Sequence, residues 1–218
     1  MGVFIGSALA ALFAAIKIAA VAKVSATAIA GVLAAGSSVA IVASSFANGN
    51  YVVQFKVEIA DVSNEALINH ENHINAGYLV NSPVSVYADG VEAFNGHKAA
   101  NSATGCSGTA SWKIGNTGKI MVLMYSIPYS HDFHANWLAV GIFPEQDTTN
   151  FYSKMYYDAE RNFKRKQFYW NTNPLKYSGD SDYEVVASMG TSHKPEISVV
   201  FSPKDKNNLS PKMKKLVG

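Results

Sequence analysis

Cysteine is scarce in this chain of 218 residues, and its positive and negative charges nearly balance. Cys106 is the only cysteine, so no intrachain disulfide framework can form and the fold must rely on its core. The formal net charge is only +2, from 18 basic and 16 acidic residues. The sequence therefore lacks the concentrated basic surface that tracks nucleic-acid phosphates, and we expect no nucleic acid among its partners.

Charge is almost absent from residues 1–50, which are rich in Ala, Val, Ile, Gly and Ser. Lys17 and Lys23 are the only charged residues there, and 24–47 contains none. One helix over 24–47 would be ~36 Å long at 1.5 Å per residue, enough to cross a hydrocarbon core of ~30 Å. We expect residues 23–50 to form a long apolar helix that inserts into a membrane, ending in a hinge at Asn48, Gly49 and Asn50, because Asn and Gly tolerate left-handed conformations.

Residues 1–22 allow two interpretations. Val3 to Ile16 is apolar and Ala20-Val21-Ala22 is a small-residue cleavage site, a pattern typical of a signal or pro-segment. However, no Lys or Arg precedes the apolar run, and Lys17 interrupts it early. These residues are therefore predicted as either a cleaved segment or an N-terminal extension of the helix.

The periodicity changes at Tyr51. From Val53 to Ile59 apolar residues alternate with polar ones, which predicts a strand with one face in a core and the other in water. Further strands are predicted at 74–80, 84–88, 110–114, 120–127, 138–143, 183–189 and 197–202, with turn sequences at 89–90, 95–96 and 115–118. Many short strands at this spacing favour a mainly β fold, with a β-sandwich over residues 51–202.

Three segments depart from the strand pattern. Residues 150–161, after the plausible caps Asp147 and Thr148, place Tyr152, Met155 and Tyr156 at helical spacing. We expect this helix to pack on the sheet, with its tyrosine hydroxyls in a partly wet pocket. The basic cluster at 161–166 is interpreted as a solvated face, and the basic tail at 203–218 as a disordered extension.

The loop that follows the run 120–127 is aromatic. It carries Tyr129, Phe133 and Trp137, with no bulky aliphatic side chain between them. Such rings suit the headgroup layer of a bilayer, because their bodies are apolar and the tips of Tyr and Trp are polar. We predict that these three rings contact a membrane; the alternative is a loop folded back into its own core.

Three short patterns around this loop resemble the actinoporin family of pore-forming cytolysins. They are Ser126-x-Pro128-Tyr129, Asn136-Trp137 running into Val140, and Met155-Tyr156-Tyr157, and the resemblance extends from about Asn50 to the segment 197–202. It implies an actinoporin-like β-sandwich flanked by helices. It also implies a pocket, built by the turn and the tyrosines, for the phosphocholine headgroup of sphingomyelin.

By position, the resemblance assigns headgroup binding to Ser107, Ser126, Pro128, His134, Tyr152, Tyr156 and Tyr157. His134 stands where the family usually has tyrosine, and Ala76 stands where it has serine. The family's Arg-Gly-Asp tripeptide is missing. The resemblance further implies a secreted haemolysin that binds sphingomyelin and phosphatidylcholine in a target cell membrane. It would oligomerise there and insert one helix per subunit to form an ion-conducting pore.

Catalytic and metal sites are not predicted. The segment His70 to His73 lacks the spacing of a metalloprotease motif, and His131 with His134 has no evident third ligand. No phosphate-binding loop or nucleophile elbow is present, and Cys106 is expected to be a small buried residue. We therefore expect no enzyme activity, no metal and no cofactor. The alternative function is a soluble carbohydrate-binding lectin of the same fold, although a lectin has no use for the uncharged N-terminal segment.

Overall fold

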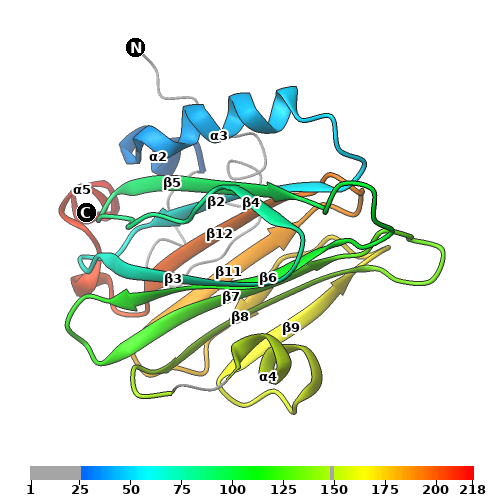
Figure 1. The fold of residues 1–218 in the computed structure, drawn as a ribbon. Helices are drawn as coiled ribbons and strands as arrows, with labels where there is room; N and C mark the ends of the chain where they lie inside the picture. Colours follow the sequence, from blue (N-terminus) through cyan, green and yellow to red (C-terminus); the bar gives the residue numbers. More distant parts are fainter. Residues whose placement is uncertain (1–25, 148–149) are drawn as a thin grey trace.

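The computed structural model describes residues 26–147 and 150–218 as a sandwich of two sheets with helices on the outer face of each (Figure 1). The seven-stranded sheet has the order β1 (Ala34–Ala35), β5 (Gly90–His97), β2 (Gln54–Asp61), β12 (Glu196–Pro203), β11 (Tyr183–Met189) and β10 (Leu175–Tyr177), with β4 (Tyr78–Asn81) also paired to β5. The five-stranded sheet has the order β3 (Leu67–Ala76), β6 (Cys106–Ile114), β7 (Lys119–Ile127), β8 (Asn136–Pro144) and β9 (Phe163–Phe168). The predicted mainly β sandwich is confirmed.

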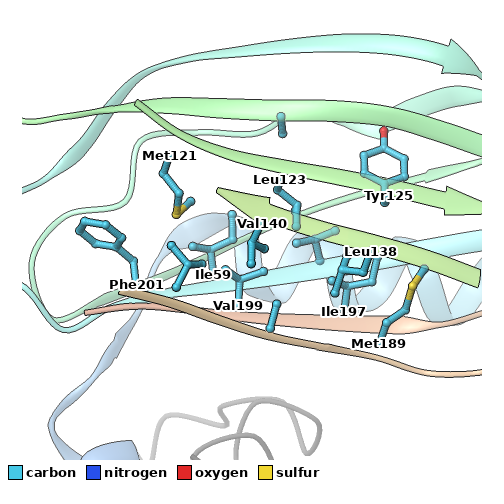
Figure 2. Close-up of a cluster of buried hydrophobic side chains, with 14 of the residues drawn as sticks. Ile59, Met121, Leu123, Tyr125, Leu138, Val140, Met189, Ile197, Val199 and Phe201 are labelled. Atoms are coloured by element: carbon cyan, nitrogen blue, oxygen red, sulfur yellow. The ribbon is translucent and has the colours of Figure 1, made fainter. Parts of the chain in front are cut away.

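The main core lies between the sheets. Figure 2 shows Leu123 and Val140 of the five-stranded sheet facing Ile59 and Val199 of the other, and all four side chains are buried. Cys106 belongs to the same cluster, as predicted, and burial raises the pKa of its thiol to about 12. Within the part of the chain that the structure describes, this cluster contains no residue before Val53. Among the described residues, the sandwich therefore closes its core without helix α3 (Ser37–Asn48).

The outer face of β2 is buried as well, contrary to the expectation that it would face water. Helix α3 packs on β5 and β2, and Gln54, Lys56 and Glu58 are buried. Lys56 pairs with Glu58 at 3.0 Å and with Glu196 at 3.1 Å, and its Nζ lies 5.9 Å from the centroid of the Phe46 ring on α3. The alternation in the sequence thus marks one apolar and one polar buried face.

Residues 26–50, the described part of the predicted helix 23–50, contain two helices instead of one. Helix α2 (Ala26–Val32) ends before β1, which pairs in parallel with β5, and α3 begins only at Ser37. The break is stabilised because the amides of Ala34 and Gly36 donate to the carbonyls of Asp89 and Val91, each at 2.7 Å, instead of to a preceding helical turn. No helix in the two described ranges is long and apolar enough to cross a membrane. Residues 1–22, with the choice between a cleaved segment and a helix extension, lie outside the described residues.

The C-terminal tail is folded, so the prediction of disorder is wrong. A 3₁₀ turn (Lys206–Asn208) leads into helix α5 (Pro211–Val217), and Ser210 caps the helix by accepting from the amide of Met213 at 3.3 Å. Leu209 and Met213 are fully buried in a second cluster, between the seven-stranded sheet, α2, α3 and α5. These two apolar residues among the lysines are what anchor the tail.

Several predicted strand boundaries also change. Residues 84–88 form only a single bridge, between Val86 and Leu67, and the predicted strand 74–80 is split into β3 and β4 at Gly77 (φ 88°). Asn95-Gly96 lies inside β5, so the turn predicted there is wrong, and β5, β9 and β10 were not among the predicted strands. The turn at 115–118 is confirmed, with positive φ at Gly115 and Gly118.

Candidate functional site

Three of the singled-out residues form a row across the five-stranded sheet. Ser107 on β6 pairs with Ser126 on β7, which in turn pairs with Trp137 on β8. Directly paired residues point to the same face, and this is the outer face, which carries helix α4 (Phe151–Tyr157). Ser107 is buried, and its hydroxyl accepts from Asn75 Nδ2 at 3.1 Å.

Helix α4 is shorter than the predicted 150–161. Asn150 caps its start by accepting from the amide of Ser153 at 3.1 Å; the predicted cap Asp147 instead pairs with Lys154 at 2.7 Å, and Thr148 lies outside the described residues. Arg165 on β9 ends the helix, since its guanidinium donates to the last free carbonyls, those of Met155 at 3.3 Å and Tyr156. Part of the predicted solvated basic face is therefore a helix cap.

The tyrosines of α4 cluster with Trp137. The Tyr156 ring centroid lies 5.9 Å from that of Trp137, 5.6 Å from that of Tyr152 and 4.8 Å from that of Tyr157. Tyr152 is buried and Tyr157 is exposed, with Tyr156 between these extremes. Burial, and then the neighbouring Tyr152, raise the pKa of Tyr156, so its hydroxyl remains a donor at neutral pH. The cluster offers aromatic faces for a cation and hydroxyl groups for phosphate oxygens.

Pro128 and His134 lie on the loop between β7 and β8. Pro128 follows Ser126 closely and is half-buried, whereas His134 is exposed three residues before Trp137. The ring contacts described above connect the α4 tyrosines to Trp137. The structure thus brings Trp137 together with five of the seven predicted headgroup residues: Ser107, Ser126, Tyr152, Tyr156 and Tyr157.

The three predicted membrane-contacting rings occupy different positions. Phe133 is 83% exposed at the loop tip, which contradicts the alternative of a loop folded into its own core. Tyr129 is 41% exposed and lies under Lys98, whose Nζ is 5.6 Å from the ring centroid. Trp137 is on strand β8, half-buried against Tyr156, and not on the loop itself.

Asn136 attaches this loop to the opposite sheet. Its fully buried side chain donates to the carbonyls of Gly190 at 2.9 Å and Ser192 at 3.0 Å, and its Oδ1 lies 3.1 Å from His131 Nε2. His131 stacks on His193 with 4.0 Å between ring centroids. Burial is the main cause that lowers the pKa of His131, so the neutral ring is the favoured form here.

The predicted hinge lies where α3 ends. The helix finishes at Asn48, and the amide of Gly49 donates to the Phe46 carbonyl at 3.3 Å. Gly49 has φ −67°, so the left-handed conformation that motivated the prediction is not used. A Cβ at this position would lie 2.3 Å from Gln54 Oε1, so a larger residue would displace the Gln54 side chain that donates to the Phe46 carbonyl. Hinge motion at Asn48, Gly49 and Asn50 stays a prediction.

Helix α3 is attached largely through polar contacts. Val39 and Val42 are its only buried residues. The Ser38 hydroxyl accepts from the Ala93 amide at 2.7 Å and donates to Glu92. The Ser45 hydroxyl lies 3.0 Å from the amide nitrogens of both Asn81 and Asn95, and Gln54 Nε2 donates to the Phe46 carbonyl at 2.9 Å.

Four further exposed rings, which were not predicted from the sequence, lie at the end of the sandwich that carries the loop between β7 and β8. Tyr51 stacks on His97 with 3.5 Å between centroids, and Tyr78 pairs with His97 across the strands. Tyr169 and Trp170 follow β9, and Trp170 is 88% exposed. The signal available in the sequence was an adjacent Tyr-Trp pair directly before the turn-forming residues 171–174.

The sequence places this chain in one class of protein. Residues 77–199 match the family described as sea anemone cytotoxic protein, and the chain belongs to this family of toxins, which are not enzymes. This is the actinoporin-like family that the sequence predicted.

The chain is similar to two curated relatives, and one solved structure shares its fold. The chain is 31% identical over 181 residues to echotoxin-2 of Monoplex parthenopeus, which covers 78% of this chain and 65% of that protein. It is 29% identical over 187 residues to tereporin-Ca1 of Terebra anilis, covering 80% and 98% of the two chains. The lipid binding protein Nakanori has the same fold, with a TM-score of 0.58 at 11% identity over 73% of this chain and 75% of that one.

Proposed function

We propose that this protein is a secreted pore-forming cytolysin. It binds phosphocholine headgroups in a target cell membrane, with sphingomyelin and phosphatidylcholine as the lipids. It then assembles with further copies and inserts its N-terminal segment. The observation that carries the proposal is that the loop with Phe133 and the predicted hinge lie at the same end of the sandwich. The Gln54 amide just after the hinge donates to the His193 carbonyl, and the Asn136 side chain at the end of the loop donates to the neighbouring Ser192 carbonyl.

The first step is docking through Tyr129, Phe133 and Trp137 with the tyrosines of α4. A trimethylammonium group on the faces of Tyr156 and Tyr157 gains about 0.5 to 2 kcal/mol per ring. Serine and tyrosine hydroxyls, those of Ser126 and Tyr157 among them, then donate to the phosphate oxygens. This end of the molecule supplies few charges, which suits a zwitterionic lipid.

The second step is release of the N-terminal segment about the hinge. The closed core between the sheets supports this step, because it contains none of the described side chains of α2 or α3. Detachment therefore leaves the lipid-binding domain folded. The hinge also lies at the docked end, since Gln54 at the start of β2 pairs with His97 at the end of β5. A helix swinging about Asn48 to Asn50 stays attached beside the membrane.

The third step is assembly of the pore. The structure holds residues 33–36 outside any helix, so the segment must rearrange into one helix to cross a bilayer. One such helix cannot line a water channel alone, so several subunits must form a ring with their smaller and more polar residues inward. Residues 23–50 carry no acidic side chain that would favour cations. The lectin alternative is less well supported, because the family match is to cytotoxic proteins.

Dye release from liposomes tests this proposal. Liposomes of phosphatidylcholine with sphingomyelin should release an encapsulated dye, and free phosphocholine at high concentration should compete. A chain starting near Asn48 should bind the same liposomes but release nothing. Permeabilisation by this shortened chain at comparable concentration would show that the N-terminal segment does not build the pore. Absence of binding by the full chain would refute the proposal entirely.

A further inference from the structure

The loop between β9 and β10 presents two aromatic rings to solvent. Trp170 is 88% exposed and Tyr169 is 42% exposed, and their rings make a T-shaped pair with 4.5 Å between centroids. A ring as exposed as Trp170 contributes almost nothing to the core. An exposed tryptophan beside a tyrosine is instead typical of a surface that meets an apolar partner.

The turn that carries these rings is well ordered by side-chain hydrogen bonds. Lys166 Nζ donates to Asn171 Oδ1 at 3.0 Å and to the carbonyl of Asn173, and the amide of Asn173 donates to Asn171 Oδ1 at 2.9 Å. The stem of the loop is held as well, since Lys166 Nζ lies 4.9 Å from the Phe168 ring centroid. The fold therefore presents Trp170 outward on a preorganised turn.

The strand register places this pair beside the Phe133 loop. Asn136, where that loop ends, pairs with Phe168, and Tyr169 follows directly. Most exposed rings of the described residues lie at this end of the sandwich: Tyr51, Tyr78, Tyr129, Phe133, Tyr169 and Trp170. Tyr87, which is 66% exposed, precedes β5 and so lies at the opposite end.

The charge at this end favours a lipid surface as the partner. Among the loop segments 50–53, 98–105, 128–135, 169–174 and 190–195, the charged side chains are Lys98, Lys194 and Asp132. A nearly neutral surface rich in rings, with a small excess of lysine, matches the boundary between phosphate groups and acyl chains in a zwitterionic bilayer. A polar protein partner would call for more charged and hydrogen-bonding groups at the rim.

We propose that Tyr169 and Trp170 form a second membrane contact, separate from the headgroup pocket, that inserts at the boundary of headgroups and acyl chains. This proposal rests on the proposed function. The loop 128–135, which carries Phe133, and the loop 169–174, which carries Trp170, then hold the domain on the membrane at two points. Two contacts fix the orientation of the domain, whereas one contact would let it tilt. The pocket supplies lipid selectivity, whereas the second contact supplies apolar burial that does not depend on the headgroup.

Three variants of the full chain test the second contact on vesicles of phosphatidylcholine and sphingomyelin. Trp170→Ala should lower the partition coefficient by about tenfold, the scale for losing one large buried side chain. Trp170→Phe should retain most of the binding, because an aromatic ring remains. Tyr87→Ala is the matched control, a comparably exposed ring at the opposite end, and it should bind like the unmodified chain.

Tryptophan quenching by lipids brominated in the upper acyl chain locates the ring directly. The unmodified chain should be quenched, and Trp170→Phe should lose much of the quenching, leaving only that of the half-buried Trp137. Free phosphocholine should compete with residual binding of Trp170→Ala, since the pocket is intact. Unchanged partitioning of Trp170→Ala together with unchanged quenching of Trp170→Phe would overturn the second contact alone.

Two other results would also contradict the second membrane contact, and they can be told apart. If the unmodified chain does not bind these vesicles, both the second contact and the proposed function fail. If the chain self-associates in lipid-free buffer and Trp170→Ala abolishes that association, the rings meet a second copy of the chain and the lipid contact is overturned. Sedimentation velocity without lipid measures this outcome.

Discussion

Helices α3 and α4 cover opposite sheets of one sandwich, but they are attached by different chemistry. Two buried valines and a set of side-chain hydrogen bonds hold α3. Tyr152 and Met155 hold α4, packed into an apolar cluster with residues such as Phe143 and Phe163. Hydrogen bonds exchange readily with water, with a net value of about 0.5 to 1.5 kcal/mol each, whereas apolar burial does not. The α3 interface therefore suits detachment, and the α4 interface suits a permanent part of the binding site.

The largest effect is expected from locking α3 in place. Ser45 on α3 and Asn81 on β4, whose side chains hydrogen-bond at 3.0 Å, are replaced by cysteine in a Cys106→Ser background. The oxidised protein should bind liposomes but release no dye, and reduction should restore release, because the hinge must open for insertion. Each single cysteine serves as control. Full lysis by the oxidised double variant would show that α3 does not leave the sheet.

Truncating one buried side chain in each helix separates the two interfaces. Met155→Ala should lower the free energy of unfolding by about 2 to 5 kcal/mol, since the fully buried Met155 leaves a cavity between α4 and the sheet. Val42→Ala should lose only about 1.5 kcal/mol, and mainly from α3. Urea denaturation measures the first effect, and faster amide exchange confined to α3 measures the second. Equal global destabilisation by both variants would contradict the comparison.

Tyrosine substitutions test whether the α4 surface holds a headgroup. Tyr156→Ala should weaken binding to sphingomyelin liposomes by about 2- to 30-fold, whereas Tyr156→Phe should cost less because the cation–π face remains. Both variants need a matching unfolding curve, since Tyr156 also contacts Trp137. Equal losses for the two variants, with no competition by phosphocholine, would indicate a structural role.

The smallest effect concerns pH and the loop between β7 and β8. Burial lowers the pKa of His131 from its usual 6.5, so protonation costs more in the folded than in the unfolded protein. Its contribution to stability is therefore complete above pH 6.5 and is lost as pH falls through the lowered pKa. The neighbouring His193, on which the ring stacks, also opposes protonation, whereas Asp132 and the hydrogen bond to Asn136 favour it. The melting temperature should fall less between pH 7 and pH 5 in His131→Gln than in the unmodified chain; identical falls would refute this assignment.

The sequence predicted the sandwich because alternation and turn residues are local signals. It predicted the tyrosine cluster through a resemblance, and the strand pairing of Ser107, Ser126 and Trp137 agrees with that grouping. It did not show that Gln54, Lys56 and Glu58 would be buried, because alternation reports polarity and not which helix lies over a face. For the same reason β9 was missed, since Arg165 holds α4 and Lys166 holds the turn that carries Trp170. The position of Trp170 beside the Phe133 loop could not be predicted from the sequence, because it depends on the strand register, which joins residues distant in sequence.

Release of the N-terminal segment would also remove strand β1 from the seven-stranded sheet. Ala34 and Ala35 pair with Gly90 and Val91 along part of the β5 edge, while β4 pairs with residues 95–97. When the segment leaves, that short edge loses its partner and presents free amide and carbonyl groups, a template for intermolecular pairing. Premature opening in solution would thus favour aggregation before a membrane is reached. Storage life in lipid-free buffer should accordingly depend on how firmly Ser38 and Ser45 keep α3 closed.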